Sequence, residues 1–431
     1  MRLNQAPLAF VCSVSFCLGS ALLSSCKESK PPSDSEHERS SDADSRDAGS
    51  EQLESEDDAN SDSSSDRSDD EVAIIDHISC EPCVPCLLSR APTDNAAWGI
   101  SLSSNAVVYI NRSEDWAPDI INRKLTVVRL SDLGRYFAKV DCQSVPGANW
   151  VFIAKPQLFE SSVGYLCHQK YKEGMSLQLV DSTLEMLDLA TGKVNHIPFR
   201  KVGLKENIQV NGDHAVWEYH AEDKSVSIFA QDLKSKETFS VSAEGSLQGG
   251  VALSGSKVAF RDGYLKSAEI WLYDLSQRKA QQITQDEELQ DSPDISNDRL
   301  VWMDTRDGTW NADETYTNSN IYSHTISTGV TERLTSDPSW QEQPSIDGDL
   351  VAWTDLRHGG RDAGFWYQEA EIYLKVIGTG QERRVTSLPG NDFSPVVKGN
   401  NIVWLHETVP GNRWGHDLYF IPVSCILGKK R

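Results

Sequence analysis

One stretch of the chain is written twice, and this repeat constrains the fold more than any other feature. Residues 292–302 (SPDISNDRLVW) align with residues 343–353 (QPSIDGDLVAW) after a forward shift of 51 positions. The same shift needs no gap to superpose Asp304, Arg306 and Gly308 on Asp355, Arg357 and Gly359, Ile321-Tyr322 on Ile372-Tyr373, and Arg333-Leu334-Thr335 on Arg384-Val385-Thr386. Self-similarity at a period of about 50 residues indicates a repeat architecture.

Each repeat contains four short apolar runs separated by turn residues. A Pro-x-Ile run leads to a Val-Trp run, and a loop beginning Asp-x-Arg-x-Gly, an Ile-Tyr run, a Thr-Gly turn and Arg-x-Leu-Thr follow. Runs of β-branched and aromatic residues bounded by Gly, Asn and Asp predict β-strands. Four antiparallel strands per repeat describe one blade of a β-propeller, whose faces are covered by the neighbouring blades. The repeat therefore predicts an all-β propeller of four-stranded antiparallel blades.

The repeat can be followed in both directions from the central pair. Forward it passes through Trp404, and backward it passes through Phe260 and Trp217. Two more degenerate units fit between Trp98 and Phe199, one around residues 107–109 and 125–128 and the other beginning at residues 150–152. We therefore expect a propeller over residues 97–424 with seven blades, although six or eight also fit.

The first 25 residues have the pattern of a secretory signal. Arg2 precedes an apolar segment from Ala6 to Leu23, and small residues follow before Cys26. A charged start, a short apolar core and small residues before the cut predict a cleaved signal rather than a retained transmembrane helix. The ending Leu-Ser-Ser-Cys resembles the lipobox of bacterial lipoproteins, which implies that Cys26 is lipidated and anchors the chain. The alternative is an ordinary signal peptide, and Lys27 after the cysteine favours the outer membrane.

Residues 26–75 are predicted to form a disordered, acidic tether. Residues 27–71 hold 17 acidic and 5 basic residues, a net charge of −12 out of the −23 of the whole chain. Such a composition buries too little apolar surface to offset its ordering entropy. The strong negative charge also argues against nucleic acid as a partner.

Six cysteines remain after those of the leader, an even number that suggests disulfides in an exported protein. Cys80, Cys83 and Cys86 lie in a Cys-rich lead-in (residues 76–96), and Cys425 begins a short tail (residues 425–431). The two ends of a closed propeller meet, so we expect one cysteine of the triplet to pair with Cys425. Cys142 and Cys167 flank the second blade and are natural partners. A metal cluster is disfavoured because no further Cys or His lies at ligand spacing, and a redox site is disfavoured because no thioredoxin-like βαβ pattern surrounds the triplet.

The repeat resembles the TolB-like β-propeller repeats of bacterial envelope proteins. Asp-x-Arg-x-Gly (304–308), Ile-Tyr (321–322) and Arg-x-Leu-Thr (333–335) recur in the order seen in that family. The resemblance implies a scaffold that binds proteins or polymers of the envelope, although some propellers with similar repeats act as hydrolases. This chain departs from the family pattern by carrying extra residues between Asp-x-Arg-x-Gly and Ile-Tyr.

No recognisable catalytic motif accompanies the repeats. Gly-x-Ser-x-Gly, His-Glu-x-x-His and phosphate loops are absent from the sequence. The Asp-x-Arg pairs recur from blade to blade, which favours a structural role. We therefore expect a protein that is not an enzyme, with no catalytic residue, no metal and no cofactor.

The inserted loops of three consecutive repeats hold the candidate binding residues. These loops and one connection between blades should emerge on a single face of the ring, and aromatic and arginine side chains are the types enriched at binding hot spots. The candidates are Trp310, Tyr316, Trp340, Phe365, Trp366, Tyr367, Arg413 and Trp414. Some of these rings will instead cover the gaps between blades.

The sequence thus predicts a lipid-anchored, monomeric, extracytoplasmic propeller that acts as a scaffold. Its expected partner is an envelope protein or a polysaccharide, and the sequence does not separate the two. The alternative is a glycan-active hydrolase or lyase that uses acidic side chains on the same face. Its carboxylates would come from Asp313, Glu314, Asp362 and Glu369.

Overall fold

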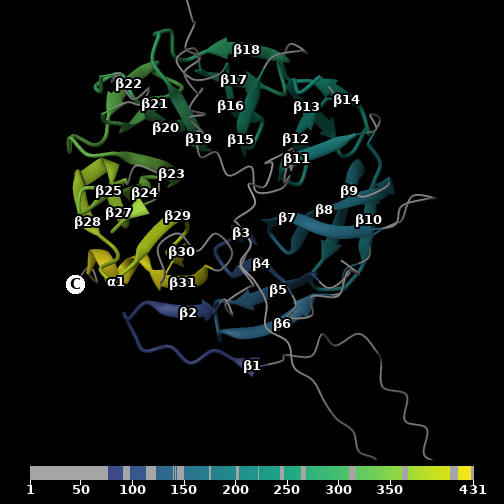
Figure 1. Cartoon of the computed structure of the whole chain (residues 1–431), viewed down its shortest axis with the longest axis horizontal. Coiled ribbons are helices and arrows are strands. Elements are labelled where there is room, and N and C mark those ends of the chain that lie inside the picture. The colour runs from purple at the N-terminus through teal and green to yellow at the C-terminus, as the bar shows by residue number, and fades with distance from the viewer. Residues whose placement is uncertain are drawn as a thin grey trace, which may run out of the picture. The chain divides into compact units, whose positions relative to one another are not determined.

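The computed structural model describes residues 76–90, 98–112, 123–138, 140, 142, 150–173, 176–199, 203–221, 223–242, 247–263, 268–309, 317–361, 367–407 and 416–428. Within these residues, the strands form seven antiparallel sheets arranged as a ring, together with one two-stranded hairpin (Figure 1). The predicted β-propeller is therefore confirmed, and it has seven blades.

The first four blades follow one another along the chain. Blade 1 contains β3 (Trp98–Leu102), β4 (Ala106–Arg112), β5 (Arg123–Arg129), β6 (Gly134–Ala138) and an additional outer strand, β1 (Asp76–His77). Blade 2 contains β7 (Trp150–Phe159), β8 (Ser162–Glu173), β9 (Ser176–Asp188) and β10 (Val194–Ile197). Blade 3 contains β11 (Leu204–Val210), β12 (His214–His220), β13 (Val226–Asp232) and β14 (Thr238–Ser240). Blade 4 contains β15 (Gln248–Ser254), β16 (Lys257–Asp262), β17 (Glu269–Asp274) and β18 (Lys279–Gln282).

The last three blades hold the repeats that are clearest in the sequence. Blade 5 contains β19 (Gln290–Ser296), β20 (Arg299–Asp304), β21 (Asn320–Thr325) and β22 (Val330–Arg333). Blade 6 contains β23 (Gln341–Asp347), β24 (Leu350–Asp355), β27 (Glu371–Val376), a 3-10 turn η2 (Ile377–Thr379) and β28 (Gln381–Arg384). The hairpin of β25 (Gly360–Arg361) and β26 (Tyr367–Gln368) is inserted between β24 and β27. Blade 7 contains β29 (Asn391–Lys398), β30 (Asn401–Glu407), β31 (Asp417–Pro422) and β2 (Cys86–Ser89), and the helix α1 (Val423–Leu427) follows β31.

The Cys-rich lead-in meets the last strand of the chain in blade 7. The outer strand β2 comes from the Cys-rich lead-in and pairs antiparallel with β31 (Figure 1). A disulfide joins Cys83 to Cys425, 342 residues away, which confirms the expected bridge between the triplet and Cys425. A second disulfide joins Cys80 to Cys86. The lead-in is therefore part of the ring, which it closes by strand pairing and by a covalent bond.

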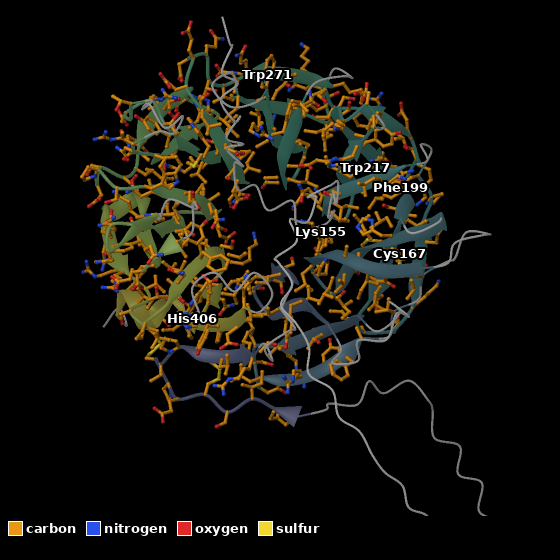
Figure 2. The ribbon with its side chains drawn as sticks, viewed as in Figure 1. Lys155, Cys167, Phe199, Trp217, Trp271 and His406 are labelled. Atoms are coloured by element: carbon orange, nitrogen blue, oxygen red, sulfur yellow. A yellow bond between two sulfur atoms is a disulfide. The ribbon has the colours of Figure 1, made fainter. Side chains whose placement is uncertain are left out.

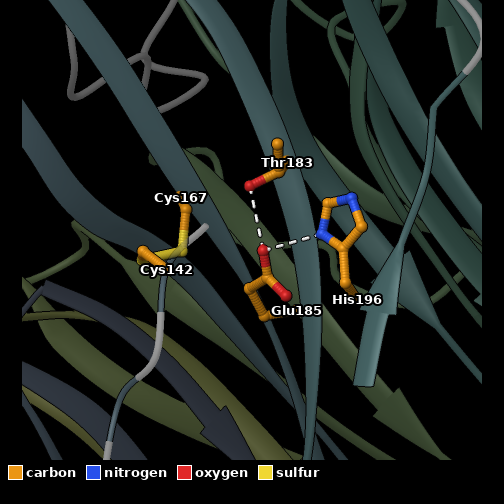
Figure 3. Close-up of a disulfide and its surroundings, with 5 residues drawn as sticks. All are labelled: Cys142, Cys167, Thr183, Glu185 and His196. Atoms are coloured by element: carbon orange, nitrogen blue, oxygen red, sulfur yellow. Dashed lines mark hydrogen bonds and ion pairs between the residues drawn. A yellow bond between two sulfur atoms is a disulfide. The ribbon is translucent and has the colours of Figure 1, made fainter. Parts of the chain in front are cut away.

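The second expected disulfide is also present. Cys142 is bonded to Cys167 on β8, and Figure 3 shows this bridge close to a small polar group in the same blade. In that group the Glu185 carboxylate accepts hydrogen bonds from the Thr183 hydroxyl and from His196 Nδ1, each at 3.0 Å. This group lies within the sheet of blade 2, where β10 pairs with β9.

The core contains one large aromatic side chain on the second strand of each blade. These seven rings are at most 1% exposed and are Tyr109, Tyr165, Trp217, Phe260, Trp302, Trp353 and Trp404. In blade 2, residues 150–152 lie instead on the innermost strand β7, so Tyr165 holds the equivalent place. Burying a large aromatic side chain contributes about 1.5–3 kcal/mol, so these seven rings add substantially to the stability of the ring of blades.

Polar side chains of the repeat join the innermost strands of neighbouring blades. Asp294 Oδ2 accepts a hydrogen bond from the backbone N–H of Ile346 at 2.8 Å, and Asp347 Oδ2 accepts one from the backbone N–H of Gly399 at 2.8 Å. Each bond joins one repeat to the next. At the junction of blades 7 and 1, Asn401 Nδ2 donates to the carbonyl oxygen of Ser104 at 3.0 Å.

The expected leader and tether lie outside the described residues. The signal peptide, lipidation of Cys26, the disordered tether and an outer-membrane location therefore stay predictions. In the parts of the chain that the structure describes, no helix has both the length and the apolar character needed to cross a membrane.

Candidate functional site

Every innermost strand contains a β-bulge, which lies near the middle of β7 and near the first residues of the other six strands. At this end of the ring the connection from the previous blade enters the innermost strand, and the second strand leads into the third; we call it the loop face. The register shifts there in all seven sheets. One residue of each bulge has φ between 44° and 66°, namely Gly99, Lys155, Asn207, Gly250, Ser292, Gln343 and Ser394. Lys155 lies near the centre of the ring in Figure 2.

These bulges are strained and are held by neighbouring side chains. A residue other than glycine in this conformation costs about 1–3 kcal/mol, and such strain is common at functional sites. The backbone N–H of Gly250 donates to Glu218 Oε1 of the preceding blade at 2.9 Å. The backbone N–H of Ser394 donates to Gln343 Oε1 of the preceding blade at 3.0 Å. The bulges therefore gather polar groups of adjacent blades around the ring centre.

A group of aromatic residues surrounds one carboxylate at the loop face of blades 6 and 7. We call Trp340, Glu342, Tyr367, Phe393 and His416 the aromatic cluster. Trp340 Nε1 donates to Glu342 Oε2 at 2.5 Å, and the Tyr367 hydroxyl donates to Glu342 Oε1. The rings of Tyr367 and Phe393 have centroids 5.6 Å apart, and the Phe393 and His416 rings meet edge to face at 4.9 Å. Glu342 is 4% exposed, whereas Trp340 and Tyr367 are half-buried.

The local backbone fixes where Trp340 and Tyr367 lie. Trp340 ends the connection into β23, and its carbonyl oxygen accepts the backbone N–H of Leu356 at 2.9 Å. Tyr367 lies on β26, and its carbonyl oxygen accepts Asn391 Nδ2 at 3.1 Å. A Cβ at Gly359 would lie 1.8 Å from the carbonyl oxygen of Gln368, so only glycine fits at the base of this hairpin. Both aromatic rings are thus positioned by ordered backbone.

A second group at the loop face is made of charged side chains from blades 3 to 5. We call Glu206, Glu218, His220, Arg261 and Asp291 the charged cluster. Glu206 and Glu218 are directly opposite on β11 and β12. His220 Nε2 lies 3.7 Å from Glu206 Oε2 and 3.5 Å from Glu218 Oε2, and Arg261 Nε lies 3.3 Å from Asp291 Oδ1. All except His220 are at most 9% exposed.

Burial and charge shift two groups of this cluster. Burial raises the pKa of Glu206, against the opposing charges of His220 and Lys155. Burial lowers the pKa of His220, but the neighbouring Glu218 and Glu206 outweigh it, so its pKa is raised overall. Burial disfavours whichever form is charged, and nearby opposite charges favour it. The cluster therefore brings carboxylates, a histidine and a guanidinium close together.

The recurring Asp-x-Arg pairs are built into the blades. Asp355 is fully buried; its Oδ2 accepts Trp353 Nε1 at 2.8 Å, and its Oδ1 accepts Arg357 Nε at 2.8 Å. The Arg357 guanidinium lies over the Tyr373 ring, 4.0 Å from its centroid. Blade 5 repeats this arrangement with Trp302, Asp304, Arg306 and Tyr322. The charge pair connects two strands and a loop of its own blade, which gives it a packing role.

Two of the predicted binding residues are brought together by the structure. Trp340 and Tyr367 both contact Glu342, as expected for neighbours on one face. The other predicted residues lie outside the described part of the chain, and they are Trp310, Tyr316, Phe365, Trp366, Arg413 and Trp414. Of the carboxylates in the alternative enzyme hypothesis, Asp313, Glu314 and Asp362 also lie outside it, and Glu369 is exposed.

The sequence analysis missed Glu342, the charged cluster and the bulges. A signal for the bulges was present, because proline inside a sheet is confined to edge strands and bulges. Four bulge residues precede a proline, namely Lys155, Ser292, Gln343 and Ser394. The same prolines would also have pointed to the acidic residues two positions before them, Asp291 in blade 5 and Glu342 in blade 6. Nothing in the sequence indicated that Glu206, Glu218 and His220 converge.

In the described residues, no group of three or more His, Cys, Asp or Glu side chains is placed to hold a metal ion. The charged cluster therefore does not form a recognisable metal centre.

Comparisons with known proteins identify the fold and no family. No family model matches the chain, and no curated protein matches it. An oligogalacturonate lyase in complex with manganese matches with a TM-score of 0.52 and 16% identity, over 79% of this chain and 94% of that one. An acylaminoacyl peptidase of Pyrococcus horikoshii matches with a TM-score of 0.53 and 12% identity, over 76% of this chain and 51% of that one. This chain therefore spans about half of that peptidase.

The solved structures that match also include a putative TolB from Agrobacterium tumefaciens. Its TM-score is 0.37 at 14% identity, over 59% of this chain and 86% of that one. The likeness to the lyase and the peptidase corrects one expectation from the sequence. The chain was expected not to be an enzyme, yet these similar propellers are enzymes. At identities this low the likeness shows the fold alone, so no enzymatic role is established either.

Proposed function

We propose that the loop face binds a polysaccharide of the cell envelope and that the aromatic cluster contacts its sugar rings. The observation that carries this proposal is the shared hydrogen bonding of Trp340 and Tyr367 to the Glu342 carboxylate. Two aromatic rings from different segments are thereby held in fixed orientations beside a buried acceptor. Because the rings are already ordered, binding costs little additional conformational entropy.

Sugar rings are a suitable ligand for such a surface. Their C–H groups pack against the electron-rich faces of aromatic rings, and their hydroxyl groups hydrogen-bond to a few polar side chains nearby. Half-buried Trp340 and Tyr367 supply the aromatic surface. The oligogalacturonate lyase among the proteins of similar fold is an example of a propeller whose name denotes a sugar substrate. The envelope location rests on the leader pattern of residues 1–26.

A second candidate function is cleavage of the bound polymer. It is favoured by the same match to a lyase that acts on an oligosaccharide. Glu369, the one described member of the four predicted carboxylates, is exposed and lies beside the aromatic cluster in sequence. Release of shorter oligosaccharides during the binding experiment would select this alternative.

The test is affinity electrophoresis of the full chain in gels that contain one soluble polysaccharide each. The panel holds laminarin, mannan, alginate and polygalacturonate. Trp340→Ala should weaken binding to the retarding polymer at least about tenfold, a loss of about 1.4 kcal/mol. Tyr367→Phe keeps the ring but removes the bond to Glu342, so a smaller loss is expected.

Trp271→Ala is the matched control, because Trp271 is also half-buried but lies on the third strand of blade 4, towards the outer edge of the ring (Figure 2). This variant should bind as the wild type does, and circular dichroism should show all three variants folded. Retention of full binding by Trp340→Ala, or binding of none of the polymers by the wild type, contradicts the proposal. Capture of an envelope protein that Trp340→Ala loses would replace the polysaccharide with a protein partner.

A further inference from the structure

The charged cluster contains polar atoms that packing of the blades leaves without a well-formed hydrogen bond. Glu218 has a structural role, since its carboxylate accepts Asn207 Nδ2 at 2.8 Å and the backbone N–H of Gly250 at 2.9 Å. These bonds hold two bulges and two blades together. Glu206, His220 and Arg261 make no comparable hydrogen bond to a bulge among the described residues.

Two buried nitrogen atoms in the cluster make no hydrogen bond within the described residues. They are His220 Nε2 and Arg261 Nε. Arg261 is only 9% exposed, and its Nη1 already donates to the carbonyl oxygen of Gly263 at 2.8 Å. Each nitrogen faces a carboxylate, since His220 Nε2 lies 3.5 Å from Glu218 Oε2 and Arg261 Nε lies 3.3 Å from Asp291 Oδ1, so each is ion-paired without a well-formed hydrogen bond. A ligand oxygen that accepts a well-directed hydrogen bond from these nitrogens would add to those ion pairs.

The neighbouring blade approaches these groups through glycine. A Cβ at Gly249 would lie 3.1 Å from Arg261 Nη2 and 3.4 Å from Glu218 Oε1. Gly250, the next residue, has φ of 66°. Without side chains at these two positions, Arg261 and Glu218 come close to the same stretch of backbone, which brings polar groups of blades 3 and 4 together.

The mixture of signs indicates which ligand fits. The cluster contains three carboxylates, from Glu206, Glu218 and Asp291, beside the Arg261 guanidinium and His220. An anion placed there would meet the carboxylates, and a cation would meet the guanidinium, so either ion is repelled by part of the site. A neutral hydroxyl group both donates and accepts. Neighbouring hydroxyls of an uncharged sugar can donate to Glu206 while accepting from His220 and Arg261.

We infer that the charged cluster is a second sugar-contact site, which takes an uncharged sugar unit of the polymer bound at the loop face. This inference rests on the proposed function. Glu206 and Glu342 stand at equivalent positions, immediately before the bulge of their innermost strands, in blades 3 and 6. The two clusters therefore belong to the same face, three blades apart. One polysaccharide chain that contacts both lies across the centre of the ring.

The experiment compares neutral and acidic polymers on the full chain. Laminarin and mannan are the neutral probes, and polygalacturonate and alginate are the acidic probes. The informative variant is Glu206→Gln, which keeps the size of the side chain and removes a carboxylate whose pKa is already raised by burial. Its matched control is Glu269→Gln, because Glu269 also starts a strand at the loop face and burial raises its pKa, but it lies on the third strand of its blade.

We expect the wild type to bind a neutral polymer at least tenfold more tightly than either acidic one. Glu206→Gln should reduce binding of the neutral polymer at least tenfold, while Glu269→Gln and the thermal stability of both variants stay near the wild-type values. Tighter binding of an acidic polymer overturns the inference, and so does an unchanged affinity in Glu206→Gln. If Trp340→Ala loses binding and Glu206→Gln does not, the proposed function stands and this inference fails. If neither variant loses binding, both fail.

Discussion

Blades 5 and 6 and blade 7 have the same 51-residue frame but different polar groups at the loop face. The first and second strands pair Gln290 with Asp304 in blade 5 and Gln341 with Asp355 in blade 6. At the equivalent place in blade 7, Asp392 pairs with His406. In blade 7 the carboxylate is therefore on the first strand, and a histidine occupies the position on the second strand where blades 5 and 6 have their aspartate.

The buried tryptophan explains what the three blades share. Trp302 and Trp353 donate Nε1–H to the aspartate two residues later, and Trp404 donates to Asp392 on the opposite strand, each at 2.8 Å. A buried indole N–H without an acceptor is costly, so every one of these blades supplies a carboxylate. The strand that supplies it is free to vary.

The second partner of the carboxylate differs in its chemistry. In blade 6 it is Arg357, which does not lose its proton, whereas in blade 7 it is His406, whose Nδ1 lies 2.8 Å from Asp392 Oδ1. Burial lowers the pKa of His406, but the hydrogen bond and charge of Asp392 outweigh it, so the pKa is raised. The Asp355–Arg357 pair of blade 6 is a permanent ion pair, whereas the corresponding Asp392–His406 pair of blade 7 can gain and lose a proton.

The largest effect is expected when the permanent ion pair is broken. Asp355→Ala leaves Trp353 Nε1 and the Arg357 guanidinium without their buried partner, and such a change costs about 3–5 kcal/mol. The measurement is the free energy of unfolding in urea. Asp223→Ala is the control, because Asp223 is exposed and accepts only from Ser225 in its own turn. A loss below about 1 kcal/mol for Asp355→Ala would contradict this account of the repeat.

A smaller loss is expected when the closure that is unique to blade 7 is cut. Removing the Cys83–Cys425 disulfide as Cys83→Ser with Cys425→Ser should cost about 2–4 kcal/mol, because a native cross-link restricts the unfolded chain. Pairing of β2 with β31 remains. The double variant Cys142→Ala with Cys167→Ala, which opens a bridge spanning 25 residues, is the comparison and should lose less. Equal losses would show that ring closure adds nothing beyond strand pairing.

Replacing the carboxylate of blade 7 should cost less than the matching change in blade 6. Asp392→Asn keeps an acceptor for Trp404 and lets His406 respond by losing its proton, so we expect a loss of about 1–2 kcal/mol. Asp355→Asn should lose more, because the arginine stays charged. Titration of His406 by NMR gives a second readout, since its pKa should fall when Asp392 becomes neutral. An unchanged His406 pKa would disprove the coupling.

These blades also show how far the sequence alone could go. Four strands per unit, their order and the antiparallel ring followed from the period and from turn residues such as Gly348, because local chemistry and the repeat agree on one fold. A bridge from the cysteine triplet to Cys425 followed from the meeting of the chain ends, without the choice of Cys83, and the Cys142–Cys167 bridge followed from the flanks of blade 2. Tyr367 was predicted because inserted loops of successive blades must share a face, and Trp340 because the connections between blades reach that same face.

The rest depends on contacts between blades, which a period does not encode. Glu206 and His220 lie in blade 3, and their meeting depends on the pairing of β11 with β12 and on the approach of Gly249 from the next blade. The β2 strand escaped notice because four residues of a lead-in have no repeat to mark them. The different position of the carboxylate in blade 7 becomes clear only when the Asp392–His406 pair is compared with the Gln341–Asp355 pair of blade 6.

The smallest predicted effect concerns His406 and His416 of blade 7, whose pKa values are shifted in opposite directions by folding. Burial, together with the neighbouring charge of His406, lowers the pKa of His416 to about 4, and its Nδ1 is buried without a hydrogen bond among the described residues. Between pH 6.5 and 4, His416 is therefore protonated in the unfolded chain but neutral in the folded chain. The contribution of His416 to stability is present above pH 6.5 and is lost as the pH falls.

His406 has the opposite sign, because its raised pKa adds stability below pH 6.5 that disappears as the pH rises through the folded-state value. The two contributions partly cancel in the wild type, so single variants are needed to see them. Between pH 7.5 and 5.5, His416→Phe should gain about 1 kcal/mol of unfolding free energy relative to the wild type, and His406→Gln should lose stability over the same range. Parallel pH profiles for the wild type and His416→Phe would mean that His416 takes up its proton in the folded protein, and the contrast between blade 7 and blades 5 and 6 would then rest on His406 alone.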